Sequence, residues 1–312
     1  MRAFLFPGQG SQAVGMGAAL AEASQAARDT FAEVDEALGQ NLFRLMREGP
    51  EDELKLTENA QPAIMANSLA VFAALTKEGG VDLAKAANFV AGHSLGEYSA
   101  LAAAGSFDLP TTAKLLKLRG QAMQRAVPVG QGAMAALLGA DLELARRIAE
   151  AAARGEVCTV ANDNDPSQVV LSGHKGAIDR VVEIAKEMGA KRAIPLPVSA
   201  PFHCPLMQPA AEAMRDALSY VVVGDPVVPV FANVTAQPES DPDTIRNLLV
   251  EQVTGMVRWR ESVANMGEAG VEEFVELGGK VLGPMVKRIL PDVKVTSVVS
   301  IEDLEALAKE IV

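Results

Sequence analysis

The stretch Gly92-His93-Ser94-Leu95-Gly96-Glu97-Tyr98-Ser99-Ala100 decides the fold, because it sets a serine between two glycines in a Gly-x-Ser-x-Gly frame. The apolar run 88–91 before it predicts a strand, and the small, proline-free run 95–104 predicts a helix that ends at Gly105. A tight turn between the two needs glycine where backbone segments approach closely. In this setting Ser94 is a nucleophile on an elbow; the alternative is a plain turn in which Ser94 caps the helix.

Length and composition exclude several classes of protein. The chain has 312 residues, enough for two domains or for one large domain with an insertion. Its formal net charge of −12 argues against nucleic acid or a membrane surface as a partner. No signal peptide and no apolar run long enough to span a membrane are visible. Two cysteines outside any Cys-x-x-Cys pattern and three histidines predict a reducing, cytoplasmic location without a disulfide or a metal site.

Strands and helices alternate along most of the chain, which predicts an α/β fold with a parallel sheet covered on both faces. Pro62 is expected in the first turn of its helix, where proline is tolerated. The expected strands are 3–6, 88–91, 227–233, 271–277 and 293–299, and the expected helices are 18–38, 62–77, 95–104, 110–125, 206–221, 244–253, 259–269 and 300–312.

The central part of the chain has a different order of elements. Strands are expected at 133–138, 157–161, 168–172 and 192–196, and helices at 141–153 and 176–188. This β-α-β-β-α-β order is typical of a ferredoxin-like domain. We therefore expect a small ferredoxin-like domain at 128–197. It is inserted into a large α/β-hydrolase-like catalytic domain with a parallel sheet, formed by 1–127 and 198–312.

A serine nucleophile needs a base, and the chain offers three histidines. His93 adjoins Ser94, so its side chain should point away, and His174 falls in a turn of the small domain. His203 lies in a proline-bracketed loop where the chain re-enters the large domain, so it either faces the elbow or is merely structural. A hydrolase triad places an acid and then a histidine late in the chain, whereas 109 residues follow His203. This departure favours a Ser–His dyad oriented by a backbone carbonyl.

Two further segments indicate how an acyl group would be held. The loop around Gln9 follows a strand but lacks the Gly-Lys-Ser/Thr ending of a phosphate loop. Its backbone N–H can join that of Leu95 in stabilising an oxyanion, or the loop is an ordinary tight turn. Arg119 lies in an apolar helix and needs an anionic partner. That partner is either a carboxylate of the protein or a carboxylate of a substrate.

Taken in order along the chain, these segments resemble the malonyl-CoA:acyl-carrier-protein transacylase family of type II fatty acid synthesis. The resemblance covers essentially the whole chain. The chain departs from the family at two places. The usual Gly-Pro-Gly-Lys is shortened to Gly278-Gly279-Lys280, and the loop 162–166 carries two acids, which are expected to alter the lip of the small domain. The matching segments are 6–12, 91–100, 118–120, 132–136, 202–203, 249–252 and 278–282.

The resemblance implies a ping-pong S-malonyltransferase of fatty acid biosynthesis. Malonyl-CoA would acylate Ser94, and the phosphopantetheine thiol of acyl carrier protein would then accept the malonyl group, with no cofactor. His203 would act as base and acid. The N–H groups of Gln9 and Leu95 would bind the oxyanion, and Arg119 would bind the malonyl carboxylate.

Three further roles are implied by the resemblance alone. Gln252 would orient the histidine base through its backbone carbonyl and line the pocket. His93 would support the site. Phe202 lies just before the histidine base, and in related polyketide acyltransferases a phenylalanine at this position accompanies specificity for malonyl rather than methylmalonyl.

Other functions stay open at this point. A serine esterase or thioesterase would hand the acyl group to water, a malonyl transferase could serve a polyketide pathway, and a silent module would only bind a carrier protein. Because carrier proteins are typically acidic, docking is expected on a local basic patch, and the chain is expected to act as a monomer. The candidate cations of this patch are Lys114, Lys117, Lys191, Arg192, Lys287 and Arg288.

Overall fold

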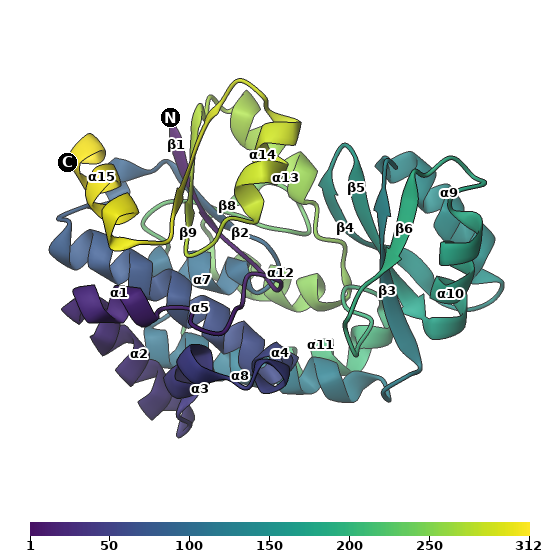
Figure 1. Ribbon diagram of the computed structural model, residues 1–312, viewed down its shortest axis with the longest axis horizontal. Helices are drawn as coiled ribbons and strands as arrows, with labels where there is room; N and C mark the ends of the chain where they lie inside the picture. Colours follow the sequence, from purple (N-terminus) through teal and green to yellow (C-terminus); the bar gives the residue numbers. More distant parts are fainter.

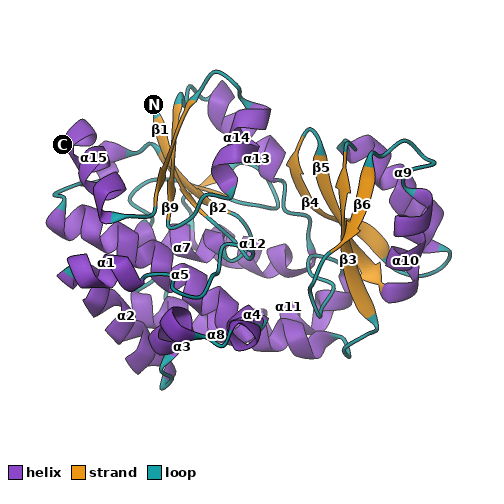
Figure 2. Ribbon diagram, in the orientation of Figure 1, coloured by secondary structure: helices purple, strands orange, loops and turns teal.

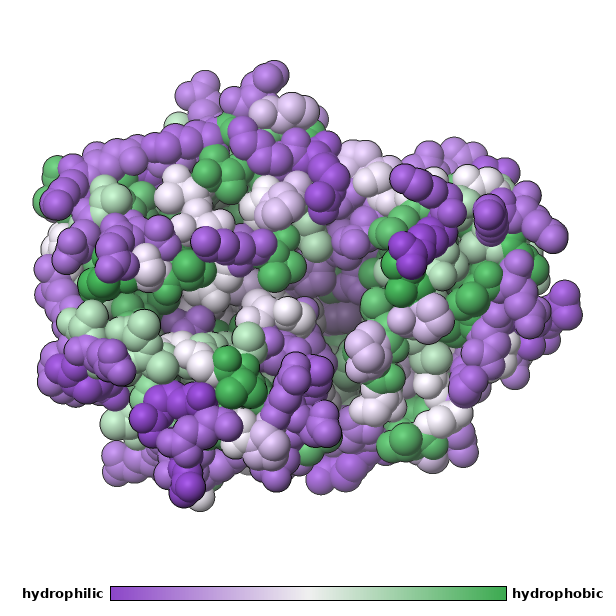
Figure 3. All heavy atoms as spheres, viewed as in Figure 1, coloured by the Kyte–Doolittle hydropathy of each residue, from purple (hydrophilic) through white to green (hydrophobic).

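The computed structural model describes residues 1–312 as two lobes, each built around its own sheet (Figures 1 and 2). A hollow separates the lobes on the face shown in Figure 3. The large lobe holds a six-stranded sheet whose first five strands run parallel and whose last strand pairs antiparallel, so the predicted parallel sheet is confirmed. In spatial order the strands are β10 (Lys294–Val298), β9 (Glu273–Leu277), β1 (Arg2–Phe6), β2 (Phe89–Gly92), β7 (Val230–Phe231) and β8 (Pro238–Glu239).

Helices cover both faces of this sheet. A π-helical turn (Ala74–Glu78) extends the central helix α5, and a 3₁₀ turn (Pro205–Met207) precedes α11. The helices of the large lobe are α1 (Ala18–Ala23), α2 (Gln25–Leu38), α3 (Leu42–Glu48), α4 (Glu51–Lys55), α5 (Thr57–Ala73), α6 (Leu83–Ala86), α7 (Gly96–Ala103), α8 (Leu109–Ala126), α11 (Gln208–Ser219), α12 (Pro242–Thr254), α13 (Trp259–Glu268), α14 (Leu282–Ile289) and α15 (Ile301–Ile311).

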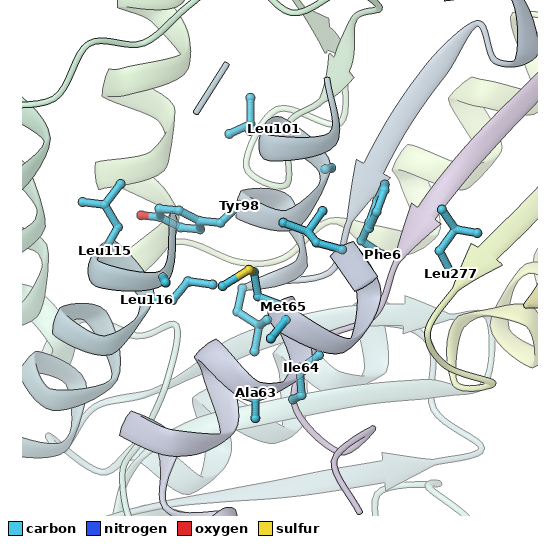
Figure 4. Packing of buried hydrophobic residues seen from close by; sticks show 14 of the residues in the cluster. Phe6, Ala63, Ile64, Met65, Tyr98, Leu101, Leu115, Leu116 and Leu277 are labelled. Atoms are coloured by element: carbon cyan, nitrogen blue, oxygen red, sulfur yellow. The ribbon is translucent and has the colours of Figure 1, made fainter. Parts of the chain in front are cut away.

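The alternation of side chains along β1 explains why two helical layers are needed. Phe4 and Phe6 point into the main core beneath α5, α7 and α8, where Figure 4 shows Phe6 in the same apolar cluster as Tyr98. Ala3 and Leu5 point to the other face and join a smaller core beneath α13 and α14. A strand buried on both faces reads as a continuous apolar run, as the first strand of this chain does.

Three sequence expectations for the large lobe are wrong in detail. The helix expected at 18–38 is broken at Ser24, whose extended backbone ends α1 and whose hydroxyl accepts the Ala27 N–H to cap α2. Pro62 does not open its helix, because α5 already begins at Thr57. The strand expected at 227–233 shortens to β7, since only two of its residues pair in the sheet.

The small lobe, defined here as residues 132–195, confirms the predicted order of elements. Its antiparallel strands lie in the spatial order β4-β5-β3-β6, and its two helices pack with them around a separate core. The elements are β3 (Gly132–Leu138), α9 (Leu142–Ala153), β4 (Cys158–Asp165), β5 (Gln168–His174), α10 (Lys175–Ile184) and β6 (Arg192–Pro195).

The end of β4 fastens the small lobe to the large one through the backbone. The Asp163 N–H donates to the carbonyl of Val257 at 3.0 Å, and the Val257 N–H donates to the carbonyl of Ala161 at 2.8 Å. The pairing of β4 with β5 shifts register on either side of this contact, which frees the backbone groups of β4 to turn towards the large lobe.

Two ion pairs reinforce that attachment. Arg260 of α13 lies 2.8 Å from the Asp163 carboxylate, and Arg288 of α14 lies 2.7 Å from the Asp165 carboxylate. Both acids are buried, with side-chain exposures of 1% and 0%. The two acids of the loop 162–166 therefore bind the lip of the small lobe to the large one.

Three structural findings bear on the expectations from composition. Cys158 and Cys204 are both free and buried. No three His, Cys, Asp or Glu side chains gather as a metal site would require. None of the helices is both long and apolar enough to cross a bilayer.

We predict that Arg288→Met lowers the free energy of unfolding by about 1–3 kcal/mol, because it leaves the buried Asp165 carboxylate without its cation. The matched control is Arg44→Met, which removes the exposed pair of Arg44 with Glu48 and should cost less than about 0.5 kcal/mol. Urea denaturation of both variants measures the difference. Equal losses would show that the pair between the lobes contributes no more than a surface pair.

Candidate active site

Ser94 lies at the turn between β2 and α7 with a backbone φ of 54°, the left-handed region that non-glycine residues rarely adopt. The glycines on either side make this turn possible. A Cβ on Gly92 would lie 1.8 Å from the Gly96 carbonyl oxygen, and a Cβ on Gly96 would lie 2.2 Å from the Phe6 carbonyl oxygen. The sequence frame thus becomes a strained elbow that presents the serine hydroxyl at the carboxyl end of the sheet.

His203 is placed as a base for this serine. Its Nε2 lies 2.7 Å from the Ser94 Oγ, and its Nδ1 lies 2.8 Å from the backbone carbonyl of Gln252. Because a carbonyl only accepts, Nδ1 carries the hydrogen and Nε2 is free to take the proton of the serine. No carboxylate contacts the ring, so the pair forms a dyad oriented by a backbone carbonyl.

The surroundings of His203 favour its neutral form. Burial and the positive charge of Arg119 lower the pKa of His203 to about 3. The histidine is therefore neutral at every pH in the physiological range. Like Ser94, it has a left-handed backbone, with φ of 53°, which aims the ring at the elbow.

Arg119 enters the site from α8 and is almost completely buried, with 1% of its surface exposed. Its Nη1–H donates to the Gln61 Oε1 at 2.7 Å, and its Nη2–H groups donate to the Gln252 Oε1 at 2.9 Å and the Ser94 Oγ at 3.1 Å. Its Nε–H has no partner. The guanidinium lies over the Tyr98 ring at 5.6 Å, and no protein carboxylate lies within ion-pair distance. Of the two partners considered for Arg119, the protein does not supply the first, a carboxylate in direct contact with the guanidinium.

The glycine that follows Arg119 explains how the guanidinium reaches its neighbours. A Cβ on Gly120 would lie 2.6 Å from the Glu58 Cα and 2.7 Å from the Thr57 carbonyl oxygen. Only glycine lets α8 approach the start of α5 so closely. That approach brings Gln61 of α5 within hydrogen-bond distance of Arg119.

The backbone N–H groups of Gln9 and Leu95 fit the role of an oxyanion hole. They follow β1 and β2, which are adjacent parallel strands, so both lie at the same edge of the sheet. Neither N–H donates to another group of the protein, and both residues line the cavity next to Ser94. Two unpaired donors beside a nucleophile are suited to a developing negative charge.

The cavity has a volume of about 270 Å³ and lies in the hollow between the lobes (Figure 3). The large lobe contributes the reactive groups. Met134 and Asn162 of the small lobe, with the segment 196–198 that leaves it, form the opposite wall. Phe202 also lines the cavity, directly before His203 in the chain.

A network of amides behind the cavity holds the reactive groups. Gln252 is fully buried and, contrary to the expectation, does not line the cavity. Its Nε2 donates to the Ser94 carbonyl at 3.0 Å and to the Glu97 Oε2 at 2.9 Å. Asn233 accepts the Ser94 N–H at 2.8 Å and donates to the Gly92 carbonyl at 2.7 Å.

Sequence reasoning did not single out Gln61, Glu97 or Asn233. For Asn233 a signal existed, because it follows a parallel strand next to the elbow strand, where site residues gather. Gln61 and Glu97 carry no such signal, since their roles depend on how α5 and α7 pack.

The His93 side chain bonds to the small lobe and not to Ser94, although it lines the same cavity. Its Nε2 lies 2.8 Å from the Asn164 Oδ1 of the small lobe, and its ring lies 5.7 Å from the Trp259 ring. Burial lowers the pKa of His93, which favours the neutral ring. The residue therefore ties the elbow to the lip of the small lobe.

The six cations proposed for carrier docking do not form one free surface. Lys117 donates to the amide oxygens of Gln40 and Asn59, both at 2.9 Å. Arg288 is bound to Asp165 between the lobes. These two side chains are engaged within the protein, and docking on the other four, Lys114, Lys191, Arg192 and Lys287, stays a prediction.

Comparison with known proteins agrees with this geometry. Residues 3–282 match the protein family described as "Acyl transferase domain". The chain belongs to this acyl transferase family. It is 46% identical over 289 residues, 92% of each chain, to the malonyl CoA-acyl carrier protein transacylase of Escherichia coli K12.

Two solved structures of the family are similar along the whole chain. An acyl-carrier-protein S-malonyltransferase from Bartonella henselae has 51% identity and a TM-score of 0.97, with 99% of each chain covered. A malonyl-transacylase solved in complex with its type II PKS acyl-carrier protein has 41% identity and a TM-score of 0.95, again over 99% of each chain. The α/β fold with its second, antiparallel sheet is thus that of the acyl transferase family.

We predict that acylation of Ser94 stays level as the pH falls from 6 to 4.5, because a base with its pKa near 3 remains neutral throughout. A histidine with the ordinary value near 6.5 would lose activity about tenfold per pH unit over the lower part of this range. Rapid-quench acylation followed by mass spectrometry measures the rate, and circular dichroism at each pH checks that the protein stays folded. A tenfold loss per unit below pH 6.5 would contradict the low pKa.

Proposed function

We propose that this chain transfers a malonyl group from malonyl-CoA to the phosphopantetheine thiol of an acyl carrier protein, through a malonyl ester on Ser94. The observation that carries the proposal is the Arg119 guanidinium, buried beside the nucleophile without a carboxylate partner. In malonyl-CoA the carboxylate is two bonds from the acyl carbon. An acyl carbon bound to the Ser94 Oγ therefore places that carboxylate next to Arg119. The names of the relatives support the same substrate and acceptor.

The first half of the reaction uses the dyad directly. The Ser94 Oγ attacks the thioester carbonyl while His203 Nε2 takes its proton, and the N–H groups of Gln9 and Leu95 stabilise the oxyanion. When the tetrahedral intermediate collapses, the C–S bond breaks and His203 gives its proton to the leaving thiolate of CoA. The result is a malonyl ester, a neutral histidine and a free thiol.

The second half reverses the roles. The carrier thiol gives its proton to His203 and attacks the ester, and the Ser94 Oγ leaves and recovers the proton from the imidazolium. A malonyl carboxylate on Arg119 reduces the positive charge that helps to lower the pKa of His203. The correct substrate therefore makes the histidine a stronger base when it is needed.

Selectivity for malonyl over acetyl follows from the same guanidinium. An acetyl group leaves the buried guanidinium without a direct anionic partner, whereas a carboxylate forms charge-assisted hydrogen bonds with it. Sites built on such polar contacts discriminate against analogues by roughly 10⁴. An esterase or thioesterase that hydrolyses uncharged acyl groups would have no use for a buried cation beside the nucleophile, so this alternative is not favoured.

We propose fatty acid synthesis as the pathway, with polyketide synthesis as the second candidate because one similar structure is that of a transacylase with its type II PKS carrier. Comparing the rates of malonyl transfer to the two kinds of carrier protein tests this choice.

We also propose that the protein is a cytoplasmic monomer that needs no cofactor. Free buried cysteines support the location, and a site completed by residues of one chain needs no second copy.

We predict that mixing the protein with malonyl-CoA adds one malonyl group, and that Ser94→Ala abolishes the adduct because Ser94 has the only hydroxyl or thiol group that lines the cavity. Intact mass spectrometry measures the adduct, and peptide mapping locates it. Addition of holo acyl carrier protein should remove it and yield malonyl carrier protein. An adduct that persists in Ser94→Ala, or one lost to water as fast as to the carrier, would overturn the proposal.

We predict that Arg119→Ala lowers kcat/KM for malonyl-CoA by about 10³–10⁴ while acetyl-CoA loses far less, because only malonyl needs the guanidinium. The ratio of the two substrates is the readout, so general damage to the site cancels. The control is Lys114→Ala on the same helix, an exposed cation that should leave the ratio unchanged. Equal losses for both substrates in Arg119→Ala would exclude the carboxylate clamp.

A further inference from the structure

Glu97 is a buried carboxylate that the mechanism above does not use. It lies on the first turn of α7, one residue after the elbow, and only 2% of its surface is exposed. Its Oε2 accepts the Asn233 N–H at 3.0 Å and the Gln252 Nε2–H at 2.9 Å. No lysine, arginine or histidine lies within ion-pair distance of it. A buried ion costs several kcal/mol unless something nearby compensates its charge.

The compensating charge is one side chain away. Gln252 uses its two amide atoms as a bridge: Nε2 donates to Glu97, and Oε1 accepts from the Arg119 Nη2. Arg119 in turn donates to the Ser94 Oγ. The carboxylate and the guanidinium are thus the two buried charges of the site, separated by an amide that hydrogen-bonds to both.

The elements packed against α7 leave Arg119 as the only full charge near Glu97. On α8, Lys114 and Arg125 are exposed, and Lys117 bonds to Gln40 and Asn59. The strands β2 and β7 have no charged residue, and the one on β1, Arg2, is paired with Glu273 at the far end of the strand. The only acid of α5 is Glu58, at its outer end, and Tyr98 is the titratable neighbour on α7 itself. The remaining contacts of Glu97 are the neutral amides of Gln252 and Asn233.

A substrate carboxylate on Arg119 would put two anions around one buried cation. Burial of both anions in a low-dielectric site is unfavourable unless one of them is neutralised. The substrate carboxylate forms direct hydrogen bonds with the guanidinium, whereas Glu97 reaches it only through Gln252. Glu97 is therefore the group that accepts a proton.

We propose that Glu97 is the exchangeable countercharge of Arg119: it balances the guanidinium while the site is empty and takes up one proton when a carboxylate-bearing acyl group binds. The inference rests on the proposed function, because it needs a substrate carboxylate at Arg119. Glu97 acts through Gln252 and Arg119, so it is a positioning residue for the charge of the site. Burial raises the pKa of Glu97 to about 7, against the effects of its hydrogen bonds and of Arg119, so the proton is exchanged near neutral pH.

Proton uptake tests the inference directly. Ser94→Ala protein is titrated at pH 8 with malonyl-CoA or acetyl-CoA by calorimetry, in two buffers of different ionisation enthalpy. We expect close to one proton taken up with malonyl-CoA beyond the value for acetyl-CoA, which lacks only the carboxylate. Equal uptake for the two thioesters would overturn the inference. This measurement needs no change at Glu97, so it does not depend on the folding of a Glu97 variant.

The pH profile of Ser94 acylation gives a second test. With malonyl-CoA, kcat/KM of the unmodified protein should fall at least about threefold between pH 6.5 and pH 8.5, because the ionised form of Glu97 must first be protonated. Glu97→Gln keeps an acceptor for both hydrogen bonds but has no charge, so its profile should be level. The matched control is Glu251→Gln, an exposed glutamate next to Gln252, which should retain the fall.

The outcomes separate this inference from the function on which it rests. If the unmodified protein forms no malonyl ester with malonyl-CoA, the proposed function itself fails. If the ester forms but Glu97→Gln shows the same fall with pH as the unmodified protein, only the countercharge role of Glu97 fails. A merely structural Glu97 would change the rate at every pH without changing the shape of the profile.

Discussion

The guanidinium of Arg119 is the contact on which the rest of the site depends. It joins α5 through Gln61, α12 through Gln252 and the elbow through Ser94, so three segments distant in sequence share one buried cation. Burial of a cation among neutral partners is unfavourable by itself. Apolar packing around the charge offsets this unfavourable term. Gly120 makes that packing possible, because it lets α8 approach α5 closely. The buried guanidinium is thus locally destabilising, and the surrounding core holds it in place.

Backbone strain is concentrated at the same place. Ser94 and His203 both have a left-handed backbone, which costs of order 1–3 kcal/mol for a residue with a side chain. The elbow is held by the amides of Asn233 and Gln252, which bond to backbone groups on both sides of the serine. These amides replace the hydrogen bonds that a regular strand or helix would provide. The reactive atoms are therefore positioned before any substrate arrives.

Local pattern was enough to predict much of this molecule. The elbow, the alternation that builds the parallel sheet and the order of elements in the small lobe all depend on neighbours in sequence, such as Gly92 and Gly96 around Ser94. Ser24 shows the limit, because a single cap divides what periodicity suggests is one helix. Pro62 shows another, since the burial of α5 outweighs the preference of proline for a first turn.

The contacts that sequence reasoning missed join residues that are far apart in the sequence. Gln61 and Gln252 meet at Arg119 only after α5, α8 and α12 have packed, and no motif joins them. The lack of a direct carboxylate partner for Arg119 is equally invisible in a sequence, because the nearest acid, Glu97, reaches it only through Gln252 in three dimensions. The resemblance to a family supplied what spacing alone did not: the pairing of Ser94 with a base 109 residues later.

The split origin of the cavity walls has a consequence for how such a protein can change. The nucleophile, base and clamp are all fixed in the large lobe, whereas Met134 and Asn162 on the facing wall come from the small lobe. Substitutions in that wall alter the room available to an acyl group without disturbing the reacting atoms. Chemistry and substrate size are therefore separable traits, and new acyl specificities are accessible to evolution by remodelling one lobe alone.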